Sequence, residues 1–270
     1  MALPPTFPVL PDATNPVTPD VMAMDDSPLP VVGKATDYPA GHIIGEHAHA
    51  RGQLIHAVHG VMLVSTGGGQ WIVPPTRGIW TPGGTTHRIR CIGVVHMRSI
   101  YVRPEAAPQL PATSQAVGVS PLLRELVLAA TEIGTTPYTP DSRNGRLMRL
   151  LLDELQALPV LPLHLPQPAD PRLLSICTRL VEQPDDTATL ADWADELGVD
   201  AKTIQRLFAR DTGMTFGQWR QQARLLHGLE LLATGQKVVE VALALGYDSP
   251  SAFATMFKRQ FGQTPSEFFR

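Results

Sequence analysis

The chain has 270 residues, of which 43% are hydrophobic and 17% are charged, and its formal net charge is −3. This length fits one large domain or two of ordinary size with a buried core, and the net charge excludes a uniformly basic nucleic-acid binder. The two distant cysteines exclude a disulfide scaffold and a cysteine zinc site, while no membrane helix or secretory signal is recognisable, so we expect a cytoplasmic protein that does not enter a membrane.

Two proline-rich segments divide the chain. The first thirty residues contain eight prolines and no apolar periodicity, so we expect residues 1–30 to form a disordered head. Five further prolines between residues 159 and 171 predict a semi-rigid linker. Residues 31–158 and 172–270 are therefore the two candidate domains.

The first candidate domain begins with short apolar runs that are separated by glycine and proline. Runs of this length and spacing favour an antiparallel sandwich or barrel. The three consecutive glycines at residues 67–69 lie between two such runs and predict a hairpin turn. The runs that we expect to be strands are residues 53–58, 61–64, 70–73, 78–80 and 98–102.

Helical periodicity follows in the same domain. Residues 121–133 and 143–158 each carry leucines on one stripe, which predicts two amphipathic helices. The apolar area of the two stripes is larger than the area that one small barrel needs to have covered. We therefore expect the remaining apolar surface to be buried in a symmetric homodimer. The alternative is that the helices close the open side of the barrel within one chain. The expected dimer contacts include Leu126, Leu147, Leu151 and Leu155.

Residues 172–270 have the start and stop signals of a chain that is helical throughout. Thr189 and Asp200 are N-caps of two consecutive helices, which end before Gly198 and Gly213 respectively. A first helix is expected over residues 172–182 and one long helix over residues 215–234, followed by shorter helices over residues 238–245 and 250–261.

Two segments of this region repeat each other. The pattern WAxxLG at residues 193–198 returns as VAxxLG at residues 241–246, and each copy precedes a tight turn and a second helix. A short helix, a glycine-containing turn and a second helix are typical of the helix-turn-helix motif. Two copies in register, joined by one long helix, indicate a double helix-turn-helix domain that binds DNA.

The outer arc of each second helix carries small, amide and basic side chains opposite its apolar stripe. Such groups suit base edges, thymine methyl groups and phosphates in a major groove. Residues 170–270 contain 11 Lys and Arg against 13 Asp and Glu, so the basic groups form a local patch. A helix over residues 216–233 spans about 27 Å, which allows both second helices to enter successive major-groove segments about 34 Å apart. The candidate DNA contacts are Lys202, Gln205, Arg206, Arg210, Ser251, Ala254, Thr255, Lys258 and Arg259.

From about residue 171 to the end, the chain resembles the AraC/XylS family of bacterial transcription regulators. The most specific part of the resemblance is the run ALGYDSPSAFATMFKRQFGQTP. The resemblance implies promoter binding by a double helix-turn-helix domain that often recruits or obstructs RNA polymerase. The second recognition helix carries smaller side chains than the corresponding helix of many relatives. How much this helix contributes to the recognition of bases is therefore left open. By position, the resemblance implies DNA contacts at Lys202, Gln205, Arg206, Ser251, Ala254 and Thr255.

Histidines are concentrated in the first domain. Residues 45–60 and 82–87 resemble the two cupin motifs, and with the surrounding β-type runs they resemble the sensor barrel of AraC-type regulators. His47 and His49 face the same side of a strand, and His87 from the second motif would converge on them as three histidines do around zinc. Gln53 stands where metal-dependent cupins usually carry Glu, and a neutral amide is a poor metal ligand.

Several functions therefore remain for the barrel. It holds a divalent transition metal, or it binds a small molecule without metal, or its histidines are structural. A cupin-type metal-dependent isomerase or dioxygenase fused to a DNA-binding domain is the rival class, but paired carboxylates, a Ser-His-Asp order and a phosphate loop are not found in the sequence. A dimerisation module without an effector is a third class.

Taken together, the patterns predict an α+β multidomain protein with an antiparallel, cupin-like β-barrel, two following helices and an all-α double helix-turn-helix domain. We expect an effector-responsive transcription regulator, either activator or repressor, that binds double-stranded promoter DNA and is not an enzyme. The expected effector site consists of His47, His49, Gln53 and His87, of which the three histidines are also the candidate metal ligands.

Overall fold

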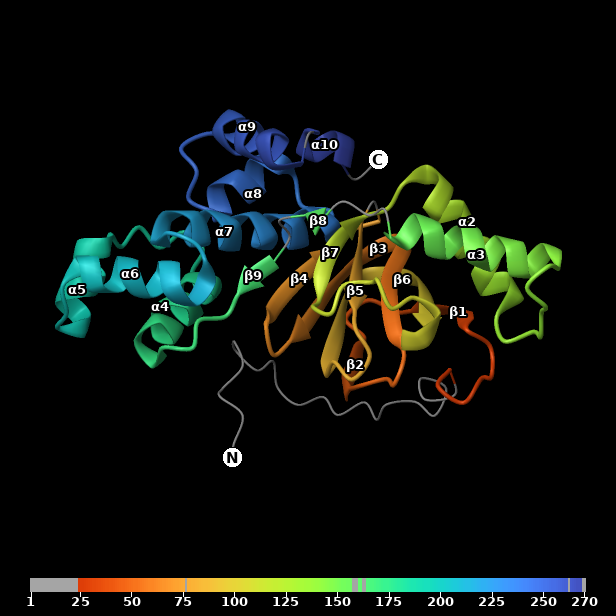
Figure 1. The fold of residues 1–270 in the computed structure, drawn as a ribbon. Helices are drawn as coiled ribbons and strands as arrows, with labels where there is room; N and C mark the ends of the chain where they lie inside the picture. Colours follow the sequence, from red (N-terminus) through yellow and green to blue (C-terminus); the bar gives the residue numbers. More distant parts are fainter. Residues whose placement is uncertain (1–23, 76, 157–159, 162–163, 262, 269–270) are drawn as a thin grey trace. The chain divides into compact units, whose positions relative to one another are not determined.

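The computed structural model describes residues 24–268 with the exception of residues 76, 157–159, 162–163 and 262 (Figure 1). The described chain forms two compact units, one ending at His164 and the other beginning at Leu165. The first unit contains an antiparallel sheet with two helices and the second is all-helical, so the predicted fold class is confirmed. Among the described residues, none of the helices has both the length and the apolar character that crossing a membrane requires.

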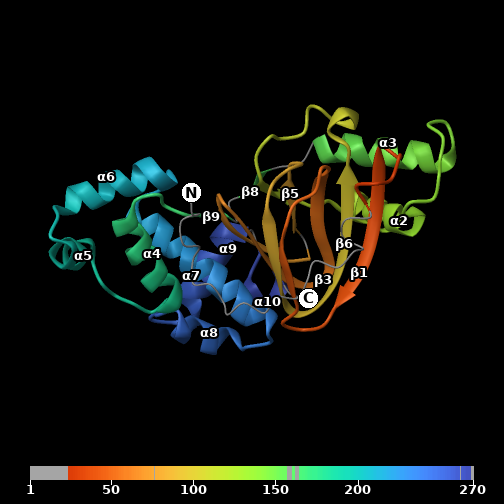
Figure 2. The same ribbon diagram turned by 90° about the horizontal axis from the view of Figure 1, so that it is seen from below.

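The sheet of the first unit is built around two long strands, β3 (Gly52–Thr66) and β6 (His87–Val102). The strand order is β1-β6-β3-β5-β7-β8, with β2 paired to β6 and β4 paired to β3. Figure 2 shows β1, β6 and β3 of this order side by side. Because β6 pairs with β1, β2 and β3, and β3 pairs with β4, β5 and β6, these two long strands connect the whole sheet. The other strands are β1 (Val31–Tyr38), β2 (Ile43–His47), β4 (Gly69–Val73), β5 (Arg77–Thr81), β7 (Gln115–Gly118), β8 (Val160–Leu161) and β9 (His164–Pro166).

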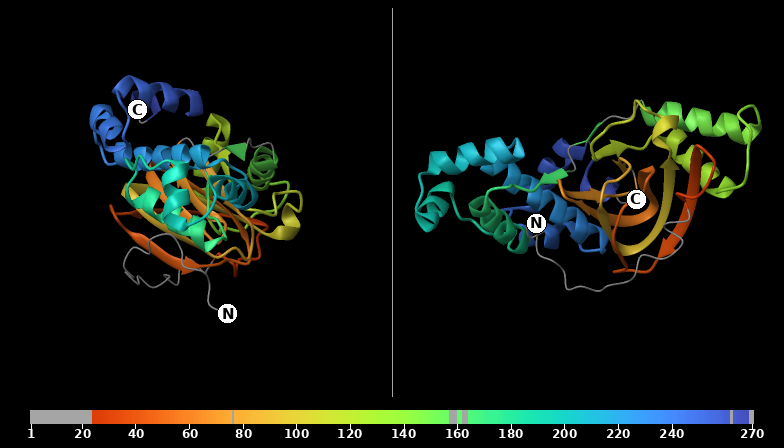
Figure 3. Two further views of the ribbon diagram at one scale, coloured as in Figure 1. Left: turned by 90° about the vertical axis from the view of Figure 1, so that its left-hand side faces the viewer. Right: turned by 60° about the horizontal axis from the view of Figure 1, so that its bottom comes forward.

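The expected runs at residues 53–58 and 61–64 belong to one strand, β3, which is interrupted only by a register shift against β6. Gly60 lies at that shift with φ +81°, and a Cβ there would approach the Val94 carbonyl oxygen to 2.1 Å. The hairpin at residues 67–69 is confirmed, since Thr66 pairs with Gly69. Among the described residues no pairing joins β1 to β8, so the sheet of the expected barrel curves without closing (Figure 3).

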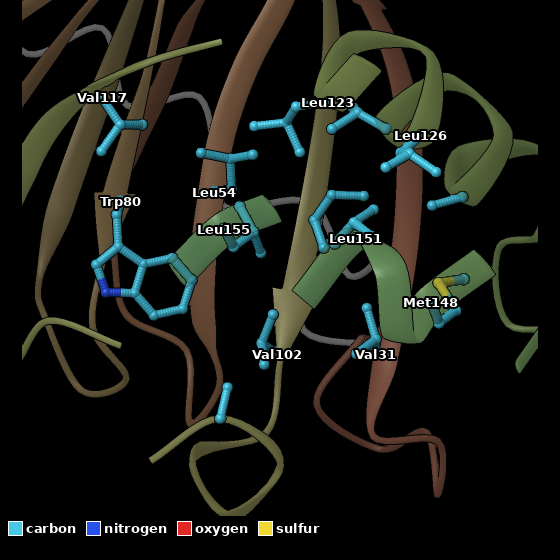
Figure 4. Close-up of a cluster of buried hydrophobic side chains, with 14 residues drawn as sticks. Val31, Leu54, Trp80, Val102, Val117, Leu123, Leu126, Met148, Leu151 and Leu155 are labelled. Atoms are coloured by element: carbon cyan, nitrogen blue, oxygen red, sulfur yellow. The ribbon is translucent and has the colours of Figure 1, made fainter. Parts of the chain in front are cut away.

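Both predicted helices of this unit are confirmed, as α2 (Pro121–Ile133) and α3 (Arg143–Gln156), and a single 3-10 turn, η1 (Pro104–Ala106), precedes them. They cover one face of the sheet and enclose a hydrophobic core (Figure 4). Leu126, Leu151 and Leu155 are buried in this core, and Leu147 packs against it. The expectation that these leucines form a dimer contact is wrong, because the apolar face of the sheet already covers them.

Part of the proline-rich head packs on the sheet. Residues 1–23 lie outside the described residues, but residues 24–30 carry side chains and carbonyl groups with defined partners. Arg51, which is 2% exposed, donates hydrogen bonds to the carbonyl oxygens of Ser27 and Leu29. The expectation of disorder is therefore wrong for residues 24–30.

The predicted linker also contributes to the sheet. Val160 and Leu161 form strand β8, which pairs with Val117 and Ala116 of β7. Residues 159, 162 and 163 of the expected linker, and the last two residues of the expected helix 143–158, lie outside the described residues. Backbone pairing with an available strand edge thus overrides the extended-linker character that the prolines suggest.

The second unit consists of helices whose caps were readable in the sequence. Thr189 forms a capping box with Asp192, and Gly198 ends the same helix in the left-handed conformation. Two helix-turn-helix pairs, α5–α6 and α8–α9, are joined by the long helix α7, which contacts helices of both pairs (Figure 1). The helices are α4 (Pro171–Glu182), α5 (Leu190–Leu197), α6 (Ala201–Thr212), α7 (Phe216–Ala233), α8 (Val238–Ala244), α9 (Pro250–Phe261) and α10 (Pro265–Phe268), of which only α10 was not expected.

The segment that enters this unit is fastened to α6 and α7. The carboxylate of Asp211, at the end of α6, accepts the backbone N–H groups of Ala169 and Asp170 at 3.2 and 3.0 Å. The indole N–H of Trp219 in α7 donates to the Pro166 carbonyl oxygen at 2.9 Å. The entering chain is therefore held by the last turn of the first recognition helix and by the helix that follows it.

Candidate functional site

The structure brings the three candidate histidines together at one end of the curved sheet. His47 ends β2 and lies directly opposite His87, the first residue of β6, while His49 follows two residues after His47. The ring centroids of His47 and His87 are 4.3 Å apart, and His49 lies 4.9 Å from His47 and 5.5 Å from His87. One ring nitrogen of each histidine lies within 4.8 Å of those of the other two.

Hydrogen bonds to the backbone orient two of these rings. His47 Nδ1 pairs with the Gly45 carbonyl oxygen at 2.7 Å, and His87 Nδ1 pairs with the Thr85 carbonyl oxygen at 2.9 Å. Since a carbonyl oxygen only accepts, each neutral ring carries its proton on Nδ1 and keeps a lone pair on Nε2. Among the described residues, His87 Nε2 and both ring nitrogens of His49 are buried without a hydrogen-bond partner.

Gln53 of β3 is held by two residues of β6, one of which, Tyr101, contacts the histidine cluster. Its amide nitrogen lies 3.1 Å from both the Ser99 hydroxyl and the Tyr101 hydroxyl, while its Oε1 is buried without a partner among the described residues. The Tyr101 ring also makes an edge contact with His49 at 5.1 Å. Sequence reasoning missed Ser99 and Tyr101. Tyr101 pairs with Gln53 and Ser99 lies two residues before Tyr101 on the same face of β6, so knowledge of the strand register would have identified both.

Burial keeps the imidazoles of the cluster neutral. It lowers the pKa of His49 and of His87 to about 4, in both cases with a smaller contribution from the neighbouring His47. Burial also lowers the pKa of His47, against the opposing effect of its hydrogen bond to Gly45. Neutral imidazole is the form that binds a transition metal, and three such ligands are enough for a zinc-like site with an open position. The cluster therefore has the chemistry of a metal site or of a small polar pocket.

The expected DNA-contacting residues lie on the outer arcs of α6 and α9. In α6 the opposite side of the helix is buried through Ile204, Leu207 and Phe208, and in α9 it is buried through Phe253 and Phe257. Ala254 is half-buried. The other candidates are exposed: Lys202, Gln205, Arg206, Arg210, Ser251, Thr255, Lys258 and Arg259.

The basic residues of this unit differ in their availability. Arg210 is bound to the carboxylate of Asp211 at 2.6 Å. Arg220 and Arg224, which the sequence places in the same basic patch, are part-buried and donate to carbonyl oxygens of the loop before α5. Among the described residues, Lys202 and Arg206 form no ion pair, so they are the free cations of the first recognition helix.

Comparisons with known proteins agree with this division. A family model described as an AraC-like ligand binding domain matches residues 29–186, and one described as a helix-turn-helix domain matches residues 193–270. NimR, an HTH-type transcriptional regulator of Escherichia coli strain K12, is 36% identical over 82% of this chain and 81% of its own length. This chain belongs to the AraC family.

A further curated protein and a solved structure match smaller or larger parts of the chain. RipA, an HTH-type transcriptional regulator of Corynebacterium glutamicum, is 35% identical over 38% of this chain and 31% of its own length. The crystal structure of ToxT from Vibrio cholerae with a bound unsaturated fatty acid covers 90% of this chain and 96% of its own, with a TM-score of 0.37 and 11% identity.

Membership of the AraC family confirms the predicted class of function. The chain is a DNA-binding transcription regulator with a ligand-binding domain, and the named relatives NimR and RipA are regulators. The match to the ligand-binding domain includes the sheet and the histidine cluster. DNA is therefore the partner of the helix-turn-helix domain, and an effector is the partner of the sheet domain.

Proposed function

We propose that the histidine cluster is the effector site of this AraC-family regulator and that His47, His49 and His87 hold a divalent transition metal there. The observation that carries this proposal is the set of three buried, neutral imidazoles with ring nitrogens within 4.8 Å of one another. An unsatisfied buried polar atom costs about 1–3 kcal/mol, and a metal ion would satisfy several of them at once.

The donor set fits such an ion. The backbone hydrogen bonds of His47 and His87 leave Nε2 of each ring as the ligand atom, which is the usual arrangement around a metal-bound imidazole. Gln53 adds an unpaired amide oxygen, whose position is fixed by Ser99 and Tyr101. When bound, the ion would supply a coordination site for an effector. The cluster itself contains no carboxylate, so we propose binding without turnover.

The second unit acts on the promoter in this proposal. The exposed residues of α6 and α9 contact successive major-groove segments, with Lys202, Gln205 and Arg206 in the first and Ser251, Ala254 and Thr255 in the second. The protein acts as a homodimer, which the exposed Leu122 and Leu150 on α2 and α3 support, and RNA polymerase is the machinery that it recruits or obstructs.

An effector regulates only by binding the two states of the protein with different affinity. We expect the metal to change operator affinity by a coupling of about 1–3 kcal/mol, which corresponds to about 5- to 150-fold. The two states differ in whether the DNA-binding domains are free to engage the operator.

The test uses full-length protein, metal-stripped and then loaded, with the DNA that flanks its own gene. Metal content and operator affinity are measured for the wild type, for His49→Ala and for His59→Ala, which changes an exposed histidine of β3 outside the cluster. We expect one ion per chain and a shifted operator affinity for the wild type and His59→Ala, and loss of both for His49→Ala. A small molecule could instead control operator binding without metal, and His49→Ala could abolish that control. This result would refute the metal ion as the ligand but would retain the histidine cluster as the effector site. A full response in His49→Ala would place the effector site elsewhere.

A further inference from the structure

A second recess with polar walls lies entirely within the DNA-binding unit. It has a volume of about 320 Å³ and lies between the first half of α7, the helix α9 and the turn before α9. We call it the arginine hollow. The lining residues that matter for its chemistry are Gly217, Arg220, Gln221, Arg224, Tyr247 and Arg259.

Two guanidinium groups of the hollow are fixed in place while keeping their charge. Arg220 donates to the Ala188 carbonyl oxygen at 3.0 Å, and Arg224 donates to the carbonyl oxygens of Pro184 and Asp186 at 2.6 and 3.0 Å. A carbonyl oxygen orients a guanidinium without neutralising it, and each group has further N–H donors for a ligand.

Acidic groups do not cancel this charge. The residues that line the hollow include no carboxylate, and Asp186, the acid whose charge acts on Arg220, is paired with Arg179 at 2.8 Å. Arg259 forms no ion pair among the described residues, and its charge and that of Arg224 both act on the Tyr247 hydroxyl. Three cations therefore surround one small space beside the phenol.

The position of the hollow indicates what occupies it. Arg259 lies one helical turn beyond Thr255 on the exposed arc of α9, so the hollow opens next to the second recognition surface. Its other wall is α7, which joins the two helix-turn-helix pairs. In the proposed docking, with α6 and α9 in successive major-groove segments, the sugar–phosphate backbone between those segments would run past α7.

We propose that the arginine hollow binds a phosphate group of the DNA backbone between the two recognised major-groove segments. Guanidinium groups bind phosphate oxygens through paired, charge-assisted hydrogen bonds, and such contacts position a protein on DNA without reading sequence. The inference rests on the proposed docking of α6 and α9, and it adds Arg220, Arg224 and Gln221 to the DNA interface as phosphate-binding residues.

Two variants test the hollow without removing the arginines that hold the loop before α5. Arg259→Gln removes one cation from an exposed position. Gly217→Glu introduces a negative charge, and Gly217→Gln is its matched control of similar shape. No atom lies within 4 Å of the position that a Cβ on Gly217 would take, so either side chain can start from this position without a clash at its Cβ.

The measurement is the affinity of full-length protein for operator and random duplexes between about 50 and 200 mM salt. Arg259→Gln should reduce the slope of log affinity against log salt by about 0.9 and weaken binding about eight-fold near 0.1 M salt, equally on both duplexes, since one phosphate contact is lost. Gly217→Glu should bind both duplexes more weakly than Gly217→Gln.

Three results would overturn the inference. An unchanged salt slope in Arg259→Gln, together with equal binding by the two Gly217 variants, would show that no phosphate enters the hollow. An effect of Arg259→Gln on the operator alone would make Arg259 a base contact. Saturable, Arg259-dependent binding of inorganic phosphate to the free protein, with DNA binding unchanged, would assign the hollow to a free phosphorylated compound. Failure of the proposed function is distinguishable, because the wild type itself would then not prefer operator over random DNA.

Discussion

His56 makes a quantitative prediction about the sheet domain. Its side chain is 0% exposed on β3, and its Nδ1 pairs with the Arg77 carbonyl oxygen at 2.8 Å, while Nε2 is buried without a partner among the described residues. Burial lowers the pKa of His56 to about 4, with the charge of Arg124 acting in the same direction and the hydrogen bond opposing it. The folded protein therefore holds this imidazole neutral at pH values where an unfolded chain protonates it.

The direction of the pH effect follows from this difference. A histidine titrates near 6.5 when unfolded and near 4 in this site, so protons bind the unfolded state preferentially between these values. Stability contributed by the neutral ring is present above pH 6.5 and is lost as the pH falls toward 4. At about 1.4 kcal/mol per pKa unit, the full loss is about 3 kcal/mol, of which about 2 kcal/mol is lost between pH 7 and pH 5.

The assay is hydrogen exchange of β3 and β6 peptides in the full-length, metal-free chain, with each variant compared with the wild type at the same pH. His56→Gln keeps a hydrogen-bond donor but cannot titrate. Between pH 7 and pH 5, the unfolding free energy of its sheet should therefore fall by about 2 kcal/mol less than that of the wild type. His59→Gln, an exposed change on the same strand, is the control and should follow the wild type. An identical pH dependence of His56→Gln and wild type would refute a buried, neutral His56.

Three further outcomes follow from the fold. Arg206→Ala should cost about 1–3 kcal/mol on the operator and much less on random DNA in equilibrium binding, and equal losses would make Arg206 a phosphate contact. Leu151→Ala should lower the unfolding free energy of the sheet domain by about 2–5 kcal/mol, since Leu151 is 0% exposed. A folded monomer with an unchanged unfolding free energy would contradict the core position of Leu151. Leu150→Ser, on the exposed side of the same helix, should leave stability within about 0.5 kcal/mol and weaken dimerisation in sedimentation, and an unchanged dimer would exclude this surface.

The all-helical unit could be predicted almost completely because its signals are local. Thr189, Asp200 and Thr215 each accept a backbone N–H at the start of a helix, and Gly198 and Gly213 adopt the left-handed conformation at helix ends. Such caps act within a few residues, so the sequence alone identifies them.

The sheet domain was predicted less well because its structure depends on pairing between distant segments. Strand β8 exists because β7 offers an edge to Val160 and Leu161, and no local pattern reveals this. The stripe containing Leu151 is equally apolar whether it meets the sheet of its own chain or a second chain. The histidines were named from the sequence, but their convergence depends on the register that places His47 opposite His87.

The fastening of residues 166–170 has a mechanical consequence. Asp211 binds Ala169 and Asp170 from the last turn of the first recognition helix, and Trp219 binds Pro166 from the next helix. A pull on the chain where it enters the unit is therefore applied directly to the last turn of α6, the helix that carries the proposed base contacts. We expect such a pull to change the angle at which α6 meets DNA.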